Sequence, residues 1–226
     1  MKALLPALLL AASPAPAAPP APAAPAAPAA RPATAPDRAA SELARKVQAY
    51  YEATRDLEAR FEQVYTYAGF GRKQLSSGTL RVKKPGMMRW DYAKPSEKTV
   101  AVKGTRLVQY EPEEHQAYVD ERFDASAMSA AVTFLLGKGD LARDFTLASG
   151  EGGALLLRPK EPDPRVESIA LSLGPSGEVV ATRVVDGAGN VNEIKFSEVK
   201  RNPGLPDSAF DVKLPKDVRR VDASGR

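Results

Sequence analysis

The chain has 226 residues, of which 43% are hydrophobic, and its 32 basic and 28 acidic side chains give a formal net charge of +4. It has no cysteine, so disulfides and thiolate metal sites are excluded. Its basic residues are interspersed with acidic ones rather than gathered in a stripe, which argues against a nucleic-acid-binding protein.

The N-terminal residues predict two segments without a core of their own. Lys2 gives a positive start, an apolar run follows from Ala3 to Ala12, and Ala15-Pro16-Ala17 fits a small-x-small cleavage site. Residues 1–17 are therefore expected to be a cleaved signal peptide, which places the mature chain in a periplasmic or extracellular space. Residues 18–38 are almost purely Ala and Pro and predict a disordered leader before a folded domain at 39–222. The alternative is one low-complexity tail.

An amphipathic helix is predicted next. Asp37 or Ser41 can cap it, and it runs to about Thr54. Its apolar stripe, which includes Leu43 and Val47, needs an apolar surface to lie against. A strand from Leu57 to Tyr67 follows.

Two strands joined by a sharp turn are predicted between Gly78 and Pro95. Apolar and polar residues alternate on both sides of Lys84-Pro85-Gly86, where Pro and Gly are typical of a turn. The simplest interpretation is ordinary sheet core, but methionine beside the only tryptophan also suits a surface that adapts to a bound molecule. The apolar face consists of Leu80, Val82, Met88, Trp90 and Tyr92.

The middle of the chain predicts a hairpin and then a very apolar helix. Residues 99–102 and 106–111 pair around Lys103-Gly104, and a short strand covers residues 116–120. Residues 126–136 then form a helix that is apolar over more than half of its surface. Such a helix must be covered on most sides, and in a sheet protein it would plug an opening.

The remaining residues predict short strands separated by turns. One of them, residues 168–173, has Ile169, Leu171 and Leu173 on a single face. About eleven strands in total predict an antiparallel barrel or curved sheet. That number exceeds the roughly eight strands whose interior side chains just fill, so an apolar cavity is expected.

Catalytic signals are absent from the sequence. His115, the only histidine, lies in a charged turn and has no second histidine to join it. No serine stands in a Gly-x-Ser-x-Gly elbow, and Gly150 to Gly153 lie between strands rather than before a helix. We therefore expect no enzyme, no metal site and no cofactor.

An ordered set of motifs resembles the outer-membrane lipoprotein carrier protein (LolA) family. The resemblance extends from Glu42 to Val221. The motifs are Gly78-x-Leu80, Lys84-Pro85, Trp90 with Pro95, the strand residues Val100, Val102, Gly104, Leu107 and Tyr110, Val185-Asp186-Gly187 with Phe196, and Phe210 with Pro215.

The resemblance implies an incomplete, half-open antiparallel β-barrel with a helical lid over an apolar cavity. It implies a monomeric periplasmic carrier for the acyl chains of lipoproteins, which an inner-membrane ABC transporter releases and an outer-membrane acceptor receives. The residues expected to line the cavity are Phe61, Leu80, Val82, Met88, Trp90, Tyr92, Val100, Val102, Ile169, Leu171 and Leu173. Those expected in the lid are Leu43, Val47, Met128, Val132, Leu135 and Leu136.

Lys84 stands where the family has an arginine that hydrogen-bonds the lid backbone and keeps the empty form closed. Lysine lacks the planar fork of arginine, so closure is expected to be weaker or shared with Arg81 or Arg89. The alternative for Lys84 is a solvated residue entering a turn.

Three other interpretations of the whole chain remain. One is a lipid-binding envelope sensor, and another is a structural secreted domain with a filled core. A receptor anchored at the outer membrane is disfavoured, because no cysteine is available for lipidation.

Overall fold

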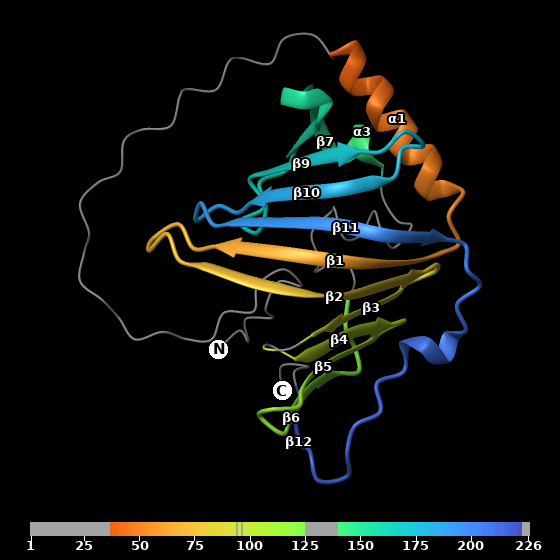
Figure 1. The fold of residues 1–226 in the computed structure, drawn as a ribbon, viewed down its shortest axis with the longest axis vertical. Helices are drawn as coiled ribbons and strands as arrows, with labels where there is room; N and C mark the ends of the chain where they lie inside the picture. Colours follow the sequence, from red (N-terminus) through yellow and green to blue (C-terminus); the bar gives the residue numbers. More distant parts are fainter. Residues whose placement is uncertain (1–36, 94, 96, 125–139, 223–226) are drawn as a thin grey trace.

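Twelve strands form one sheet in the computed structural model, which describes residues 37–93, 95, 97–124 and 140–222. The strand order is β12-β6-β5-β4-β3-β2-β1-β11-β10-β9-β8-β7 (Figure 1). The strands are β1 (Asp56–Thr66), β2 (Lys73–Lys83), β3 (Met87–Tyr92), β4 (Lys98–Lys103), β5 (Arg106–Glu111), β6 (Gln116–Asp120), β7 (Phe145–Ser149), β8 (Leu155–Pro159), β9 (Ser168–Leu173), β10 (Val179–Val185), β11 (Val191–Arg201) and β12 (Arg219–Asp222).

The sheet consists of two antiparallel meanders joined at their longest strands. Strands β1 to β6 follow one another, β7 to β11 do the same, and β11 pairs with β1. Strand β12 pairs with β6 in parallel, while no pairing joins β12 to β7 among the described residues. The predicted half-open, mainly β architecture is therefore confirmed.

The predicted number of about eleven strands misses β12. This strand begins with Arg219 and Arg220 and lacks an apolar alternation, so nothing in its sequence distinguishes it from a polar tail.

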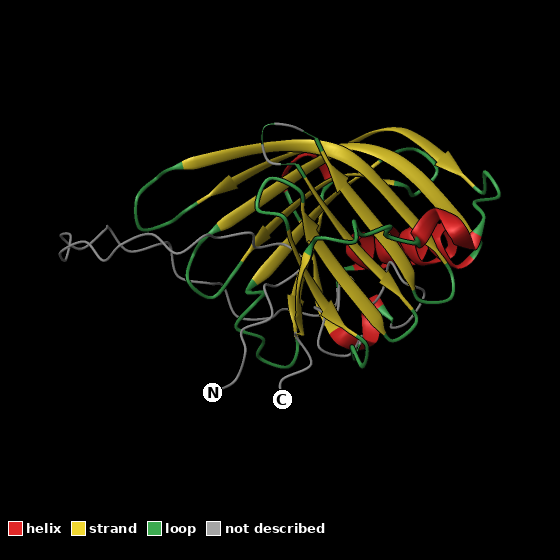
Figure 2. Cartoon of the chain, turned by 90° about the horizontal axis from the view of Figure 1, so that it is seen from below, coloured by secondary structure: helices red, strands yellow, loops and turns green. Residues whose placement is uncertain are grey.

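Alternation along β1 decides which face of the sheet is buried. Leu57, Ala59, Phe61 and Tyr65 are buried, as is Gln63, whose side-chain amide donates to Asn192 Oδ1 at 2.8 Å. Successive side chains of a strand point to opposite faces, so these residues share one face. Figure 2 shows the sheet as an arch, and this face is its inner, concave side.

The described α-helices lie on the concave side. Helix α1 (Arg38–Glu52) begins three residues before Ser41, because Asp37 Oδ1 accepts hydrogen bonds from the first-turn amides of Ala39 and Ala40 at 3.0 and 3.4 Å. Helix α3 (Leu141–Asp144) is a single turn. The predicted helix at 126–136 and the predicted signal peptide lie outside the described residues. No helix among the described residues is long and apolar enough to cross a membrane.

A C-terminal strap, residues 202–218, connects β11 to β12 (Figure 1). It lies on the outer, convex side, because Lys83 and Arg89, which donate hydrogen bonds to it, alternate with the inward-facing Val82 and Met88. It contains the 3₁₀ helix η3 (Asp207–Phe210), which contacts β3 and β4, and Phe210 is only 2% exposed. Lys83 Nζ donates to Leu205 O at 2.7 Å and Arg89 Nη1 to Asp211 O at 2.8 Å. The strap therefore occupies this part of the convex side and leaves the concave side to the helices.

Two apolar clusters fill the concave side. The first packs α1 and α3 against β7 to β10 and includes Val47, Leu155 and Ile169. The second lies on β1 to β5 and includes Met88 and Val102, each 1% exposed. The sheet thus has one half covered by helix and one half covered largely by its own side chains, as far as the described residues extend.

Candidate functional site

A cavity of about 100 Å³ lies where the two clusters meet. Its wall takes aliphatic and aromatic side chains from both halves of the sheet and from the helices. The described residues that border it are Tyr51, Thr54, Arg55, Asp56, Leu57, Ala59, Leu80, Val82, Lys84, Trp90, Leu141, Leu157, Ile169, Leu171, Val179, Thr182, Val184, Ile194, Phe196 and Val199.

The charged residues among the described wall of the cavity lie together at one place. Arg55, Asp56 and Lys84 lie close to the C-terminal end of α1, together with the hydroxyl of Thr54. The rest of the described wall is apolar apart from Thr182 and the Tyr51 side chain. Such a wall can bind a hydrocarbon group by removing it from water, and it offers little to hold a polar molecule.

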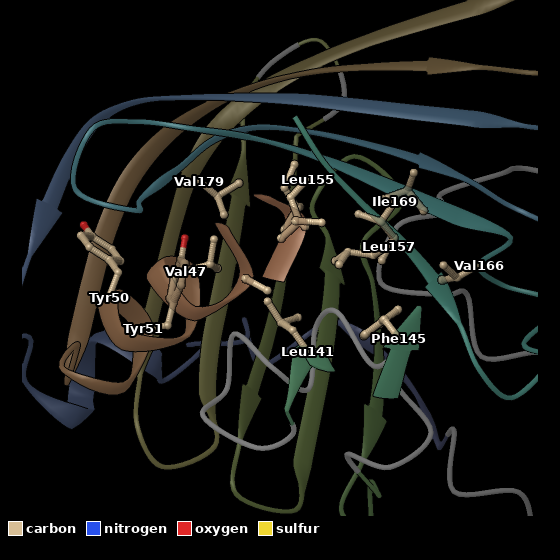
Figure 3. Packing of buried hydrophobic residues seen from close by; sticks show 14 of the residues in the cluster. Val47, Tyr50, Tyr51, Leu141, Phe145, Leu155, Leu157, Val166, Ile169 and Val179 are labelled. Carbon is tan, nitrogen blue, oxygen red and sulfur yellow. The ribbon is translucent and has the colours of Figure 1, made fainter. Parts of the chain in front are cut away.

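Helix α1 contributes Tyr51 to the cavity wall, and the rest of its apolar stripe packs against the sheet beside the cavity. Ala40, Ala44, Val47 and Tyr51 recur at helical spacing and are buried against the sheet. Figure 3 shows Val47 and Tyr51 among side chains of β8, β9 and β10. The other side of the helix carries the charged residues, which explains why the sequence places α1 over an apolar surface.

The two ends of α1 are attached differently. At its N-terminal end, Asp37 Oδ2 accepts a hydrogen bond from the Ser149 amide at 2.8 Å, and hydrogen bonds from the Ser149 side chain and amide lower the pKa of the Asp37 carboxyl. Beyond its C-terminal end, Asn202 Oδ1 accepts from the Arg55 amide at 2.7 Å. Asp56 Oδ1 in turn accepts from the Gly204 amide at 2.9 Å.

Lys84 also reaches the C-terminal end of α1. Its ammonium donates to the backbone oxygen of Tyr51, in the last turn of the helix. Its own backbone amide donates to Arg55 O at 2.8 Å, so the residue is held at both ends. Burial beside the cavity lowers the Lys84 pKa, and the nearby Glu52 partly opposes this shift.

The residues predicted to line the cavity divide into two groups. Leu80, Val82, Trp90, Ile169 and Leu171 border the cavity. The others do not border it in this structure: Phe61, Met88, Tyr92, Val100 and Val102 belong to the second cluster, and Leu173 packs beside the first.

The predicted lid residues divide in the same way. Val47 is buried on the inner side of α1, and Leu43 packs partly buried against the first cluster. Met128, Val132, Leu135 and Leu136 lie outside the described residues.

Aromatic packing holds the second cluster together. The Phe61 ring meets Trp90 at 4.7 Å and Tyr92 at 5.1 Å between centroids, both edge to face. Phe61 lies opposite Gly78 on β2, where a Cβ would come within 2.0 Å of Asp91 O and 2.9 Å of the Phe61 ring. Glycine at this position therefore lets the ring lie close to the sheet and places Trp90 at the cavity wall.

Several cavity residues were not predicted, chiefly those of β10 and β11. Ile194 stands between Glu193 and Lys195, so the period-two pattern marks it as one side of a strand. Val184 has Arg183 on one side and Val185 on the other, so its pattern is less distinct. The sequence does not indicate that these strands face Leu80 and Trp90 across one cavity, because β11 pairs with β1 from far away in the chain.

Among the described residues that line the cavity, Asp56 is the one carboxylate and none is a histidine. Among the described residues, no group of three or more His, Asp or Glu side chains could hold a metal ion. His115 lies exposed in the turn between β5 and β6 and does not border the cavity.

The chain has relatives throughout its folded part. A family model described as outer membrane lipoprotein carrier protein LolA matches residues 52–213. A protein of Dechloromonas aromatica named outer-membrane lipoprotein carrier protein is 33% identical over 166 residues, which are 72% of this chain and 79% of that protein. One of the same name from Methylobacillus flagellatus is 30% identical over 173 residues, 75% of this chain and 83% of that protein.

A solved structure of another protein shares this fold. An uncharacterized conserved protein from Thermus thermophilus superposes with a TM-score of 0.50 at 14% identity, covering 82% of this chain and 99% of that one. At this identity the likeness concerns the fold alone.

Proposed function

The chain belongs to the outer-membrane lipoprotein carrier protein (LolA) family, and on that premise we propose that it is a periplasmic chaperone that carries lipoproteins by their acyl chains. The observation that carries the proposal is the apolar cavity between α1 and the sheet. Each methylene moved from water into such a wall contributes about 0.8 kcal/mol. An acyl chain of about sixteen carbons therefore gains on the order of 10 kcal/mol before ordering costs.

The cavity must enlarge to hold its cargo. Its volume is about 100 Å³, whereas ligand pockets usually measure about 300 to 1,000 Å³. The structure thus fits an empty, closed carrier, in which α1 and the sheet bury each other's apolar side chains. We propose that α1 moves outward on loading, and that Phe61, Met88, Tyr92, Val100, Val102 and Leu173 then join the wall. The predicted second lid helix at 126–136 is part of the same proposal.

Lys84 is the residue we assign to closing the lid. Its ammonium contacts the backbone of α1 and borders the cavity, so loading that moves α1 must break this hydrogen bond. Loss of the bond favours return of the helix and expulsion of the acyl chain. Release that is driven by the return of α1 requires no catalytic group in the chain.

The carrier needs a donor and an acceptor of its cargo. We propose an inner-membrane ABC transporter as the donor and a tighter-binding outer-membrane protein as the acceptor. We further propose that residues 1–17 are removed on export, that residues 18–38 form a leader, and that the domain at 39–222 acts as a monomer.

Removal of the closing contact gives a first prediction. We expect Lys84→Met to slow dissociation of a triacylated lipopeptide about fivefold, because a solvent-screened hydrogen bond worth about 1 kcal/mol no longer favours the closed form. Stopped-flow displacement of a fluorescent lipopeptide measures the rate. Lys84→Arg, which keeps a cationic donor, serves as the control and should retain fast release. Equal rates for the methionine variant and the parent protein would remove Lys84 from the closing step.

Acyl binding itself is the experiment that tests the function. The protein from residue 37 onward is titrated with a triacylated lipopeptide, and the same peptide without acyl chains serves as the control. We expect saturable binding that requires the acyl chains. No binding of either peptide by a folded protein would favour a structural domain with a filled core, and the proposed function would be wrong.

A further inference from the structure

The hairpin of β1 and β2 ends in a tip, residues 67–75, that projects beyond the neighbouring turns of the sheet. Figures 1 and 2 both show it extending past the β10–β11 turn, at the end of the strands away from the C-terminus of α1. The Tyr67 amide donates to Arg72 O at 2.9 Å, which closes the turn. Asn190 Oδ1 accepts from the Ala68 amide at 3.0 Å and supports the tip from the adjacent turn.

This tip exposes apolar side chains. Phe70 is 77% exposed and Leu75 is 69% exposed, the two highest values among the large hydrophobic residues described. A Cβ added at Gly69 or Gly71, on either side of Phe70, would meet no atom within 4 Å. The space beside both glycines is open, and a phenylalanine that is 77% exposed adds little to the packing of the described fold.

The charged residues of the tip itself are both basic. No Asp or Glu stands between Glu62 and Asp91 in the sequence. Of the basic residues in that interval, Arg81, Lys83 and Arg89 form ion pairs and Lys84 donates to α1. Arg72 and Lys73 lie at the tip, are exposed, and form no ion pair with another described residue.

Acidic groups near the tip are already engaged. Asp186, in the adjacent turn, is buried and accepts from the amides of Ala188 and Asn190, both at 2.9 Å. Glu193 on β11 lies 3.8 Å from Arg183. The tip therefore presents an aromatic ring flanked by two unpaired cations.

We propose that this tip inserts Phe70 into the surface of an anionic phospholipid bilayer. An aromatic side chain beside cations matches the boundary between acyl chains and negatively charged headgroups. A tip of nine residues has too little surface for a protein partner, since stable protein interfaces bury about 800 Å² on each side. The inference does not depend on the carrier role, because the tip is separate from the cavity residues.

A tryptophan placed at the tip reports insertion directly. In Phe70→Trp the new indole is exposed to water, and the same titration of the parent protein, whose only tryptophan is Trp90 at the cavity wall, supplies the background to subtract. We expect a blue shift of the emission on adding vesicles of equal parts phosphatidylglycerol and phosphatidylcholine, and no shift with phosphatidylcholine alone. Quenching by brominated acyl chains in the same vesicles should accompany the shift.

Vesicle co-sedimentation of the parent protein and its variants measures affinity. We expect Phe70→Ala to weaken binding at least tenfold, and each of Arg72→Gln and Lys73→Gln to weaken it about fivefold. Leu156→Ala is the matched control, because Leu156 is the remaining exposed large hydrophobic residue described and lies on β8. It should bind as the parent protein does.

The outcomes separate the proposals. No vesicle binding by the parent protein, or binding that Phe70→Ala leaves unchanged, would overturn the membrane contact. Equal binding to neutral vesicles would overturn the assigned role of Arg72 and Lys73. Binding of the acylated lipopeptide by Phe70→Ala should equal that of the parent protein. This result would show that the variant is folded and that its loss of vesicle binding does not arise from a change in the cavity.

Discussion

Val184→Phe is expected to weaken binding of a triacylated lipopeptide roughly thirtyfold. Val184 is 8% exposed and borders the cavity from β10. A phenyl ring directed into the cavity takes the place of two or three methylenes of the acyl chain, a loss of about 2 kcal/mol at about 0.8 kcal/mol each. Isothermal titration calorimetry with the lipopeptide measures the loss.

The neighbouring residue provides the control for this prediction. Val185→Phe adds the same ring on the same strand, but to the opposite face of the sheet. It should bind lipopeptide as the parent protein does. Since the ring in Val184→Phe enters existing space, its urea midpoint should stay close to that of the parent protein. Undiminished binding by a folded Val184→Phe variant would show that acyl chains do not occupy this cavity.

Gly177→Ala is expected to lower the free energy of unfolding by about 3 kcal/mol. Gly177 lies in the turn between β9 and β10, has φ +94°, and would place a Cβ 2.6 Å from Lys46 O in the middle of α1. The positive φ costs alanine about 1 kcal/mol, and the overlap with helix backbone costs about 2 kcal/mol more. Urea denaturation measures the total.

Gly104→Ala separates these two contributions. Gly104 has φ +62°, and a Cβ there would meet no atom within 4 Å, so this variant should lose only about 1 kcal/mol. Hydrogen exchange adds a local test: α1 amides should exchange faster in Gly177→Ala and remain unchanged in Gly104→Ala. Equal losses for both variants would mean that the turn does not fix the position of α1.

Local sequence patterns predicted most of this fold. Alternation in residues 80–92 predicted the correct buried face of β2 and β3, because successive side chains of a strand point to opposite faces of the sheet. The helical stripe through Val47 gave α1 and its buried side for the same reason. The half-open sheet came from the family resemblance and from the number of strands.

Pairings between distant residues could not be predicted from the sequence alone. Phe61, Met88 and Trp90 share one apolar face, yet only Trp90 borders the cavity. The difference depends on the Phe61 ring lying over Gly78 and on β11 pairing with β1, contacts that join residues far apart in the chain. For the same reason Val184 and Phe196 were not identified as cavity residues.

The unequal attachment of the two ends of α1 predicts where an acyl chain enters during the loading proposed above. Hydrogen bonds from Ser149 hold Asp37, whereas Lys84, Asn202 and the strap at Gly204 hold the residues around the other end. We therefore expect α1, in its proposed outward movement, to turn about its C-terminal end near Thr54. Ala40 would then move much farther than Tyr51, so we expect an entrance to open first beside β7 and the contact with Lys84 to break last.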